Sequence, residues 1–296
     1  MKRIIALGFF DGVHLGHRRL LERTRQLADE AGAVACAITF DRSPGKGGLL
    51  TGLNDRVRLL NTLGGMDEVL VLPFDEALMH TPWDEFADRL LHRYEAAGLV
   101  CGWDYRFGAK AAGTAALLKN YCAGQGVLCE IIPALELEGQ LVSSTLLKAL
   151  IRAGDMETAA RFYGHPHTLS GTVVSGQGLG HRLGFPTANL LPEEDLLLPN
   201  TGVYAVRGTV EGERHIGVCN VGTRPTVGGR QISIETWLAD FDGDLYGKPL
   251  IVDFYEYLRP ERKFDSLDEL KKEIYFNQEQ ARAYFECYAS GRALRQ

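Results

Sequence analysis

A switch between two kinds of hydrophobic pattern is the feature that most constrains the fold of this chain. Up to about residue 165, short apolar runs alternate with stretches of helical periodicity. The runs predict strands at Ile4–Phe9, Val34–Phe40, Glu68–Leu72, Leu99–Gly102 and Val127–Ile132. The stretches between them predict helices at Leu15–Ala31, Asp55–Leu63, Trp83–Ala96 and Thr114–Ala123. Strands that alternate with helices indicate an α/β domain, in which helices cover both faces of a parallel sheet and the site lies at the carboxyl ends of the strands.

Beyond residue 165 the chain changes to short strands separated by clusters of Gly, Pro, Asn and Asp. This spacing predicts a small antiparallel β-barrel with strands at Thr168–Val174, Val203–Val210, Ile216–Val221, Ile232–Leu238 and Ile251–Tyr257. A C-terminal helix is predicted at Ser266–Ala289, with Ser266 as its N-cap and Glu269 three residues later. A length of 296 residues suits two domains, which we expect at 1–160 and 161–296.

Composition excludes several classes of protein. A formal charge of −6 argues against a general nucleic-acid binder. The six cysteines form no CxxC pair, which favours buried, reduced thiols over a zinc or redox site. The apolar run Ile4–Phe10 is too short and too interrupted by Asp11 and His14 for a signal peptide, and no later run has the length of a membrane span. We expect a cytoplasmic protein without a nucleic-acid or membrane partner, and its oligomeric state stays open.

The first predicted strand leads into a glycine-rich turn, GFFDGVHLGH at residues 8–17, directly before a helix. His14 and His17 are three residues apart, so both can lie on one side of the first helical turn. A helix N-terminus binds phosphate, and two imidazoles there can donate hydrogen bonds to charge that develops on phosphorus. The pattern fits attack on the α-phosphate of a nucleoside triphosphate with loss of pyrophosphate, although two ordinary histidines remain the alternative. The other candidate ATP contacts in this turn are Gly8, Phe9, Asp11 and Gly16.

Two later segments support a nucleotide site. A loop at 102–108 follows a predicted strand and offers Asp104 and Arg106 as polar candidates. A further helix opens with hydroxyl side chains and carries a cation one turn later, a combination that can hold a triphosphate. These residues are Ser143, Ser144, Thr145 and Lys148. For the two serines, a plain N-cap is the alternative.

Together these segments resemble the nucleotidylyltransferase half of the bifunctional bacterial FAD synthetases, with their G-x-F-D-G-V-H-x-G-H, G-x-D-F-x-F-G and I-S-S-T-x-I-R motifs. The resemblance implies a Rossmann-like domain in which His14 and His17 handle the ATP phosphates and Asp104 lies near the nucleotide or the flavin. It implies a triphosphate path along Ser143, Ser144 and Thr145. Two departures bear on the rate or substrate of adenylyl transfer: the family's T-F-D-P-H-P histidine is absent from residues 39–44, and Lys148 replaces an arginine.

The second half carries a glycine-rich segment at 171–180, followed by HRLGFPTAN at 181–189. Glycines in a β region mark places where backbone approaches a ligand, here at Gly176 and Gly180, although ordinary turns are the alternative. Thr187 and Asn189 are two residues apart and supply neutral oxygens to one side of an extended chain, a donor set that suits Mg²⁺. The segment is not a Walker A sequence, because no GK[ST] follows the glycines.

This segment resembles the riboflavin kinase motif G-x-V-x-x-G-x-x-x-G-R-x-L-G-F-P-T-A-N. Further matches follow at 202–204, 220–226, 235, 244–247, 258–259 and 263–264. The resemblance implies that Thr187 and Asn189 hold Mg²⁺–ATP, that Glu235 is the general base and that Arg259 contacts the flavin phosphate. Glu235 also interrupts an apolar strand, where the alternative is a solvent-facing residue. Asn277, a flavin-binding candidate, stands where the family often has Asp.

The combined resemblance implies FAD biosynthesis. The second domain would phosphorylate riboflavin to FMN with ATP and Mg²⁺, and the first would adenylylate FMN to FAD with release of pyrophosphate. One alternative is a monofunctional riboflavin kinase whose first domain is a weakened or regulatory flavin- or nucleotide-binding module. Another is a nucleotidyltransferase of the same superfamily with a different substrate, against which the barrel signature argues.

Overall fold

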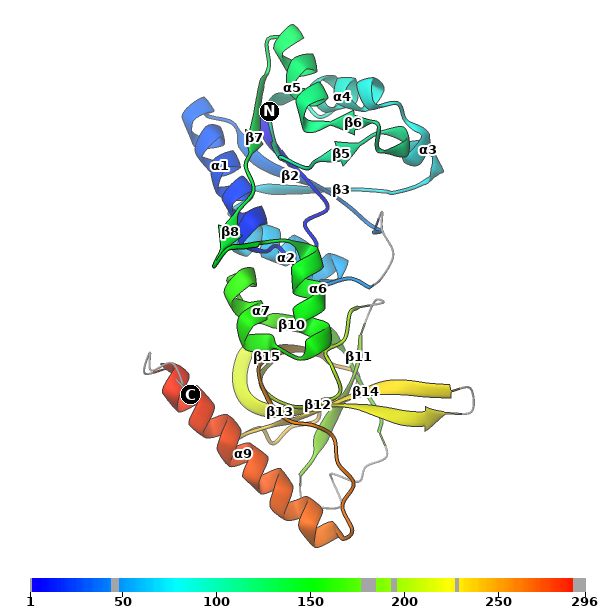
Figure 1. The fold of residues 1–296 in the computed structure, drawn as a ribbon, viewed down its shortest axis with the longest axis vertical. Helices are drawn as coiled ribbons and strands as arrows, with labels where there is room; N and C mark the ends of the chain where they lie inside the picture. The colour runs from blue at the N-terminus through cyan, green and yellow to red at the C-terminus, as the bar shows by residue number, and fades with distance from the viewer. Residues whose placement is uncertain (1, 44–47, 177–184, 193–195, 227–228, 290–296) are drawn as a thin grey trace. The chain divides into compact units, whose positions relative to one another are not determined.

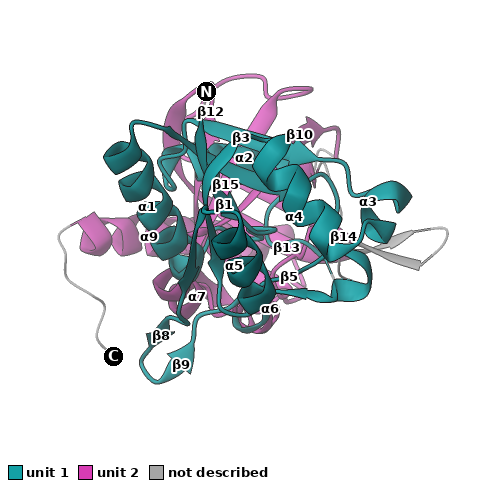
Figure 2. Ribbon diagram, turned by 90° about the horizontal axis from the view of Figure 1, so that it is seen from above, with its two compact units in different colours: residues 1–146 teal, residues 147–296 magenta. Residues whose placement is uncertain are grey.

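The computed structural model describes residues 2–43, 48–176, 185–192, 196–226 and 229–289 (Figure 1). The chain forms two compact units, residues 1–146 and 147–296 (Figure 2). Among the described residues, no helix combines the length and the apolar character that crossing a membrane requires. Five of the six cysteines are buried, as expected, whereas Cys287 is only partly buried.

The first unit is built on a parallel sheet with the order β3-β2-β1-β4-β7. Its strands are β1 (Arg3–Leu7), β2 (Val34–Phe40), β3 (Glu68–Leu72), β4 (Ala96–Gly102) and β7 (Leu128–Ile132). The chain runs outward from β1 to β3 and then returns to add β4 on the other side of β1. The carboxyl ends of β1 and β4 therefore flank the point where the strand order reverses, the position at which such sheets bind ligands.

Helices cover both faces of this sheet, as the alternating pattern predicts. They are α1 (Leu15–Ala31), α2 (Leu53–Thr62), α3 (Glu76–His80), α4 (Trp83–His92) and α5 (Ala115–Gly124). Alternate residues of β1 enter two separate cores: Ile4 packs with α1 and α2, and Ile5 packs with α4 and α5. The remaining small elements are β5 (Arg106–Phe107), η1 (Ala109–Ala111), β6 (Gly113–Thr114), β8 (Glu136–Leu137) and β9 (Gln140–Leu141).

The second unit contains a closed antiparallel barrel with the order β10-β11-β14-β13-β12-β15. Its strands are β10 (His167–Val174), β11 (Thr187–Pro192), β12 (Gly202–Val210), β13 (Glu213–Thr226), β14 (Gly229–Leu238) and β15 (Pro249–Arg259). The helix α9 (Leu267–Ala289) packs against β12 and β13 (Figure 1). Its predicted N-cap is confirmed, because Ser266 Oγ accepts the Glu269 N–H at 3.2 Å.

Two helices stand between the sheet and the barrel in sequence, α6 (Ser144–Ala153) and α7 (Met156–Tyr163). The domain boundary expected between residues 160 and 161 falls inside α7. In the structure, the first compact unit ends at residue 146 and the second begins at residue 147. The side chains of Met156, Phe162 and Tyr163 are buried, and α7 packs against β10 and β15. The helix α7 therefore belongs to the same packed body as the barrel.

Some predicted elements differ from the structure in extent. The helix predicted at Trp83–Ala96 was too long: it ends at His92, and Ala96 already begins β4. Glu95 between them has a left-handed φ of 54°, which ends the helical path. The strand β11 was not predicted at all, because its residues were interpreted only as part of a ligand loop.

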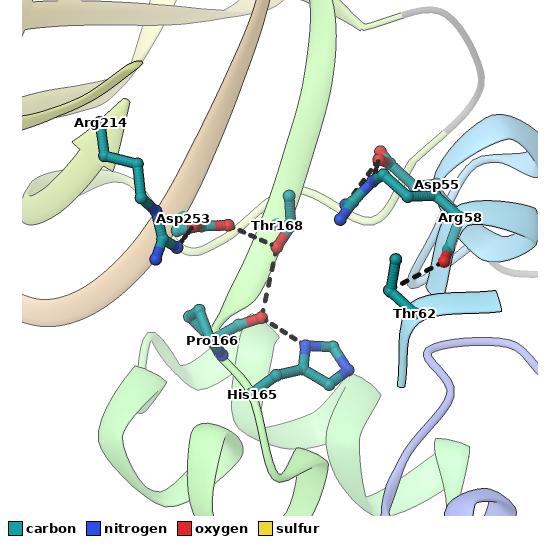
Figure 3. A network of polar contacts seen from close by, with 8 residues as sticks. All are labelled: Asp55, Arg58, Thr62, His165, Pro166, Thr168, Arg214 and Asp253. Atoms are coloured by element: carbon teal, nitrogen blue, oxygen red, sulfur yellow. Dashed lines mark hydrogen bonds and ion pairs between the residues drawn. The ribbon is translucent and has the colours of Figure 1, made fainter. Parts of the chain in front are cut away.

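A polar network ties the start of β10 to β15 (Figure 3). The carboxylate of Asp253 is buried and accepts hydrogen bonds from Thr168 Oγ1 at 2.7 Å and from the Arg214 guanidinium at 2.8 Å. Next to this network, His167 is 1% exposed and its ring lies against Tyr163 and Phe254. This ring must stay neutral in the folded state, since charging it would require solvation that the core does not provide.

Replacing His167 with phenylalanine should make the second unit less sensitive to acid. Burial, together with nearby His165, lowers the pKa of His167 from 6.5 to about 3. Between these pH values the unfolded chain binds one more proton, so unfolding becomes easier as the pH falls below 6.5, by about 1.4 kcal/mol per pH unit. Denaturant unfolding at pH 7, 5.5 and 4.5 should show a shallower fall in stability for His167→Phe than for the wild type. If the stability of both proteins falls equally with pH, His167 is not the neutral, buried group that makes the second unit sensitive to acid.

Candidate active sites

The turn between β1 and α1 has an unusual backbone. Phe10 and Val13 have left-handed φ angles of 59° and 40°, and Gly12 has one of 84°. For a β-branched residue such as Val13 this is a genuine outlier, and such conformations persist only where the surroundings enforce them. Here both side chains are at most 1% exposed in the core beneath α1 and α2. The turn is thus built as a rigid entry to the helix.

Asp11 holds this turn in place. Its Oδ1 accepts the backbone N–H groups of Leu50 at 2.8 Å and of Thr51 at 3.2 Å. Thr51 Oγ1 in turn accepts the Gly12 N–H at 3.0 Å. The Asp11 carboxylate, a candidate ATP contact, therefore has a clear structural task, and its role toward ATP stays a prediction.

The two histidines of the turn lie together, as their spacing predicts. His14 is the N-cap of α1, and its Nδ1 accepts the His17 N–H at 3.3 Å. The rings stack with 3.6 Å between their centroids. Gly16 makes room for this stack, because a β-carbon there would lie 3.2 Å from the His14 ring. Burial, and then the neighbouring His14, hold the pKa of His17 well below its ordinary value, so this ring is neutral at pH 7.

The start of α6 lies beside the histidine turn. Ser144 Oγ donates to the carbonyl of Asp11 at 3.1 Å. Ser143 Oγ accepts the Leu146 N–H at 3.3 Å, which is the plain N-cap that the sequence left open. Thr145 is exposed, and Lys148 is half-buried one turn further along the helix. The structure therefore brings two helix N-termini, those of α1 and α6, to the same place in the first unit.

Phe9 and Asp104 occupy the same carboxyl edge of the sheet. The Phe9 carbonyl accepts from Thr39 Oγ1 at 2.8 Å, and the Arg56 guanidinium lies 4.2 Å from the centre of the Phe9 ring. Gly8 is required because a β-carbon would lie 2.9 Å from the Phe10 ring. Asp104 is exposed in the turn after β4, the strand next to β1. Where the family has its histidine, this chain has Ser43, which is half-buried, and residues 44–47 lie outside the described part of the chain.

In the barrel, the register aligns the predicted kinase residues. Glu235 on β14 is paired with Asn189 on β11 and with Asn220 on β13. In the next row, Trp237 is paired with Thr187 and Val218. Paired residues in antiparallel strands have side chains on the same face, about 5 Å apart at Cβ. Glu235 is thus not a lone solvent-facing residue but the centre of a row of polar side chains.

The backbone of Gly176 lies close to the polar row around Glu235. A β-carbon at Gly176 would lie 2.2 Å from the Asn189 amide nitrogen, so no side chain fits there. The backbone of residue 176 therefore lies against the Asn189 side chain, and the role of this loop toward ATP stays a prediction. Gly180, the other predicted loop residue, lies outside the described residues.

A cavity of about 300 Å³ lies on the face of the barrel that carries Glu235, and residues of α9 form part of its wall. Four predicted site residues line it: Thr187, Glu235, Arg259 and Asn277. The Arg259 Nε donates to Asn277 Oδ1 at 3.1 Å and lies 2.8 Å from a carboxylate oxygen of Glu273. Burial is the largest influence on the pKa of Arg259 and lowers it from its ordinary value, which nonetheless leaves the guanidinium charged at neutral pH.

Several lining residues were not predicted as site residues. Asn220 and Trp237 share the face of Glu235, and Gln278 follows Asn277 on α9. The Gln278 side chain is 8% exposed, and its Nε2 is buried without a hydrogen-bond partner among the described residues. A buried, unpaired donor in a cavity wall is costly unless a ligand completes it. Asn220 begins a matched motif and could have been found from it, but Gln278 carries no signal in the sequence.

The two halves match two family models. Residues 1–146 match the model described as FAD synthetase, and residues 163–285 match the one described as riboflavin kinase. A bifunctional riboflavin kinase/FMN adenylyltransferase of Listeria monocytogenes is 33% identical, with 96% of this chain and 93% of the relative covered. Its counterpart from Pseudomonas fluorescens is 37% identical, with 95% and 92% covered.

A solved structure from Streptococcus pneumoniae, titled a macrolide-efflux protein, superposes with a TM-score of 0.85 at 28% identity and covers 95% of this chain and 94% of its own. The fold and the two sites define a class of protein in which a nucleotidyl-transfer unit is followed by a barrel kinase. The chain belongs to the bifunctional riboflavin kinase/FMN adenylyltransferase family. The resemblance and the fold class expected from the sequence are both confirmed.

Proposed function

We propose that this chain makes FAD in two ATP-dependent steps, phosphorylating riboflavin in the second unit and adenylylating FMN in the first. The observation that carries the proposal is the polar row of Glu235 between Asn189 and Asn220, at the wall of a cavity of about 300 Å³. Incubation with riboflavin, ATP and Mg²⁺, followed by chromatography of the flavins, tests both steps. A protein that forms neither FMN nor FAD would contradict the proposal.

In the kinase step, Glu235 accepts the proton of the ribityl 5′-hydroxyl, and the resulting oxygen attacks the γ-phosphorus of ATP while ADP leaves. Thr187 and Asn189 offer neutral oxygens on the face of the Glu235 carboxylate, a donor set that fits Mg²⁺. Bound there, Mg²⁺ would neutralise charge on the ATP phosphates. Arg259 contributes a cation at the cavity wall for the flavin phosphate, and the Gln278 amide is available to the flavin.

In the adenylylation step, a phosphate oxygen of FMN attacks the α-phosphorus of ATP, and pyrophosphate leaves. His14 and His17 lie at the N-terminus of α1, and the first residue of α6, Ser144, is hydrogen-bonded to the turn that leads into α1. Because the low pKa keeps His17 neutral, its ring serves as a hydrogen-bond donor to the transition state and not as a general acid. Ser143, Ser144 and Thr145 would then line the path of the triphosphate, with Lys148 further along.

We propose that the kinase activity belongs to the second half alone, although the exact division of the chain is a prediction. A fragment of residues 155–296 retains the whole of α7 and should convert riboflavin to FMN. A fragment of residues 164–296 lacks α7, which buries Met156, Phe162 and Tyr163, so it should fold poorly. Circular dichroism measures the folding of each fragment, and FMN formation measures its kinase activity. A folded, inactive 155–296 fragment would argue against this assignment.

A further inference from the structure

One carboxylate on α9 joins two arginines of the cavity wall. Glu273 Oε1 lies 2.8 Å from Arg259 Nε, and its other oxygen pairs with the Arg262 guanidinium. The Glu273 side chain is 13% exposed and that of Arg259 is 18% exposed, so this is not a solvated surface pair. Both arginines line the cavity, whereas Glu273 lies behind them and does not.

Glu273 offsets the positive charge of two arginines, which a neutral residue at this position could not do. Two guanidinium groups side by side repel each other, and the carboxylate between them offsets that repulsion. Removing one partner from such a buried group leaves an uncompensated charge, which then moves toward solvent or toward another partner. Without Glu273, the Arg259 guanidinium would keep its hydrogen bonds to the Asn277 side chain and the Pro260 carbonyl, but it would lose the charged partner that fixes its direction in the wall.

Asn277 completes the arrangement from one helical turn further along α9. Its Oδ1 accepts from Arg259 Nε at 3.1 Å, and its Nδ2 lies 3.5 Å from Glu273 Oε1. Residues four apart on a helix are neighbours on one face, so positions 273 and 277 both reach Arg259. Position 277 could consequently hold Arg259 if it carried the carboxylate instead.

We propose that Glu273 is a positioning residue of the kinase site, which fixes the Arg259 guanidinium in the cavity wall where the phosphate end of the flavin binds. This inference rests on the proposed kinase function. Glu273 acts through Arg259 and touches neither substrate. A purely structural role, in which Glu273 only fastens α9 to the end of β15, predicts a loss of stability and no dependence of turnover on the charge at position 277.

The test is a set of variants at two positions in the full-length chain. Glu273→Gln should lower kcat/KM for riboflavin by about tenfold, because loss of orientation at a reacting group is costly. Asn277→Asp alone should lower kcat/KM below that of the wild type, since it places a second carboxylate beside the first. In the Glu273→Gln background, the same Asn277→Asp change should raise kcat/KM to within about threefold of the wild type. The effect of Asn277→Asp on kcat/KM should thus be a decrease in the wild type and an increase in the Glu273→Gln background, as expected if either carboxylate can hold Arg259.

Glu279→Gln is the matched control, because Glu279 is exposed on the same helix and should leave the rate unchanged. Wild-type kcat/KM in Glu273→Gln, or no gain from Asn277→Asp in that background, would overturn the inference. If Glu273→Gln also lowers the melting temperature, a double variant that regains stability but not turnover would overturn it too. Absence of FMN formation by the wild type would instead overturn the proposed function, and conversion of added FMN to FAD reports separately on the first unit.

Discussion

Replacing Glu235 with glutamine should lower FMN formation by about 10²–10⁴-fold, the usual effect of losing a general base. Glutamine keeps the size and the hydrogen-bonding capacity of the side chain, so the row formed with Asn189 and Asn220 should persist. Riboflavin binding, measured by quenching of flavin fluorescence, should therefore change little. The loss should be in kcat, because the proton is transferred only after both substrates are bound.

Two controls sharpen this experiment. Glu213→Gln changes an exposed glutamate on β13, away from the cavity, and should behave as the wild type. Adenylylation of added FMN by Glu235→Gln should be normal, because that reaction is assigned to the first unit. A Glu235→Gln variant within about threefold of the wild-type kcat would remove this carboxylate from the mechanism.

Replacing His17 with alanine should reduce FAD formation from FMN by at least about 10²–10³-fold, the range found for loss of one donor to a transition-state oxygen. The change also removes the ring that stacks on His14 at 3.6 Å, so the remaining imidazole loses one of the contacts that fix its direction. Riboflavin phosphorylation should be unchanged. Incubation with FMN and ATP, followed by chromatography and a pyrophosphate assay, measures the loss directly.

His80→Ala provides the comparison for His17→Ala, because His80 is an exposed histidine at the end of α3 in the same unit. Its removal should leave both activities intact. If His17→Ala still forms FAD at near the wild-type rate, the histidine pair is not the adenylyl-transfer site. A parallel fall in FMN formation would indicate general damage to the protein and not a local effect.

Much of the fold follows from the sequence because its hydrophobic periods are strong. The alternation in β1 sends Ile4 and Ile5 to opposite cores, and this pattern is visible without coordinates. Boundaries were less certain where residues suit either structure, as at Ala96, which begins a strand although a helix was predicted there. The strand β11 was missed because its surrounding glycines and prolines resemble a loop, and only pairing with β10 and β14 makes it a strand.

The candidate sites could be predicted where their residues lie close together in the sequence. His14 and His17 are neighbours in sequence, so their spacing reveals their stacking. In contrast, the Asp11 carboxylate binds backbone groups about 40 residues away, and no local pattern indicates this task. The same is true of Gln278, which lines the cavity, and of Glu273, which pairs with Arg259 in its wall, because both depend on the packing of α9 against the barrel.

The central place of β1 also bears on how this protein is made. Of the described strands, β1 is synthesised before the others, yet its partner β4 ends at Gly102, and the hydrogen bond that closes the histidine turn comes from Ser144. At about 5–20 residues per second, synthesis of the intervening chain takes about 7–30 s. Until β4 has been made, one edge of β1 has no partner strand, although β2 can already pair with its other edge. The start of α6, and not β1, therefore sets the moment at which the proposed nucleotide site of the nascent chain is complete.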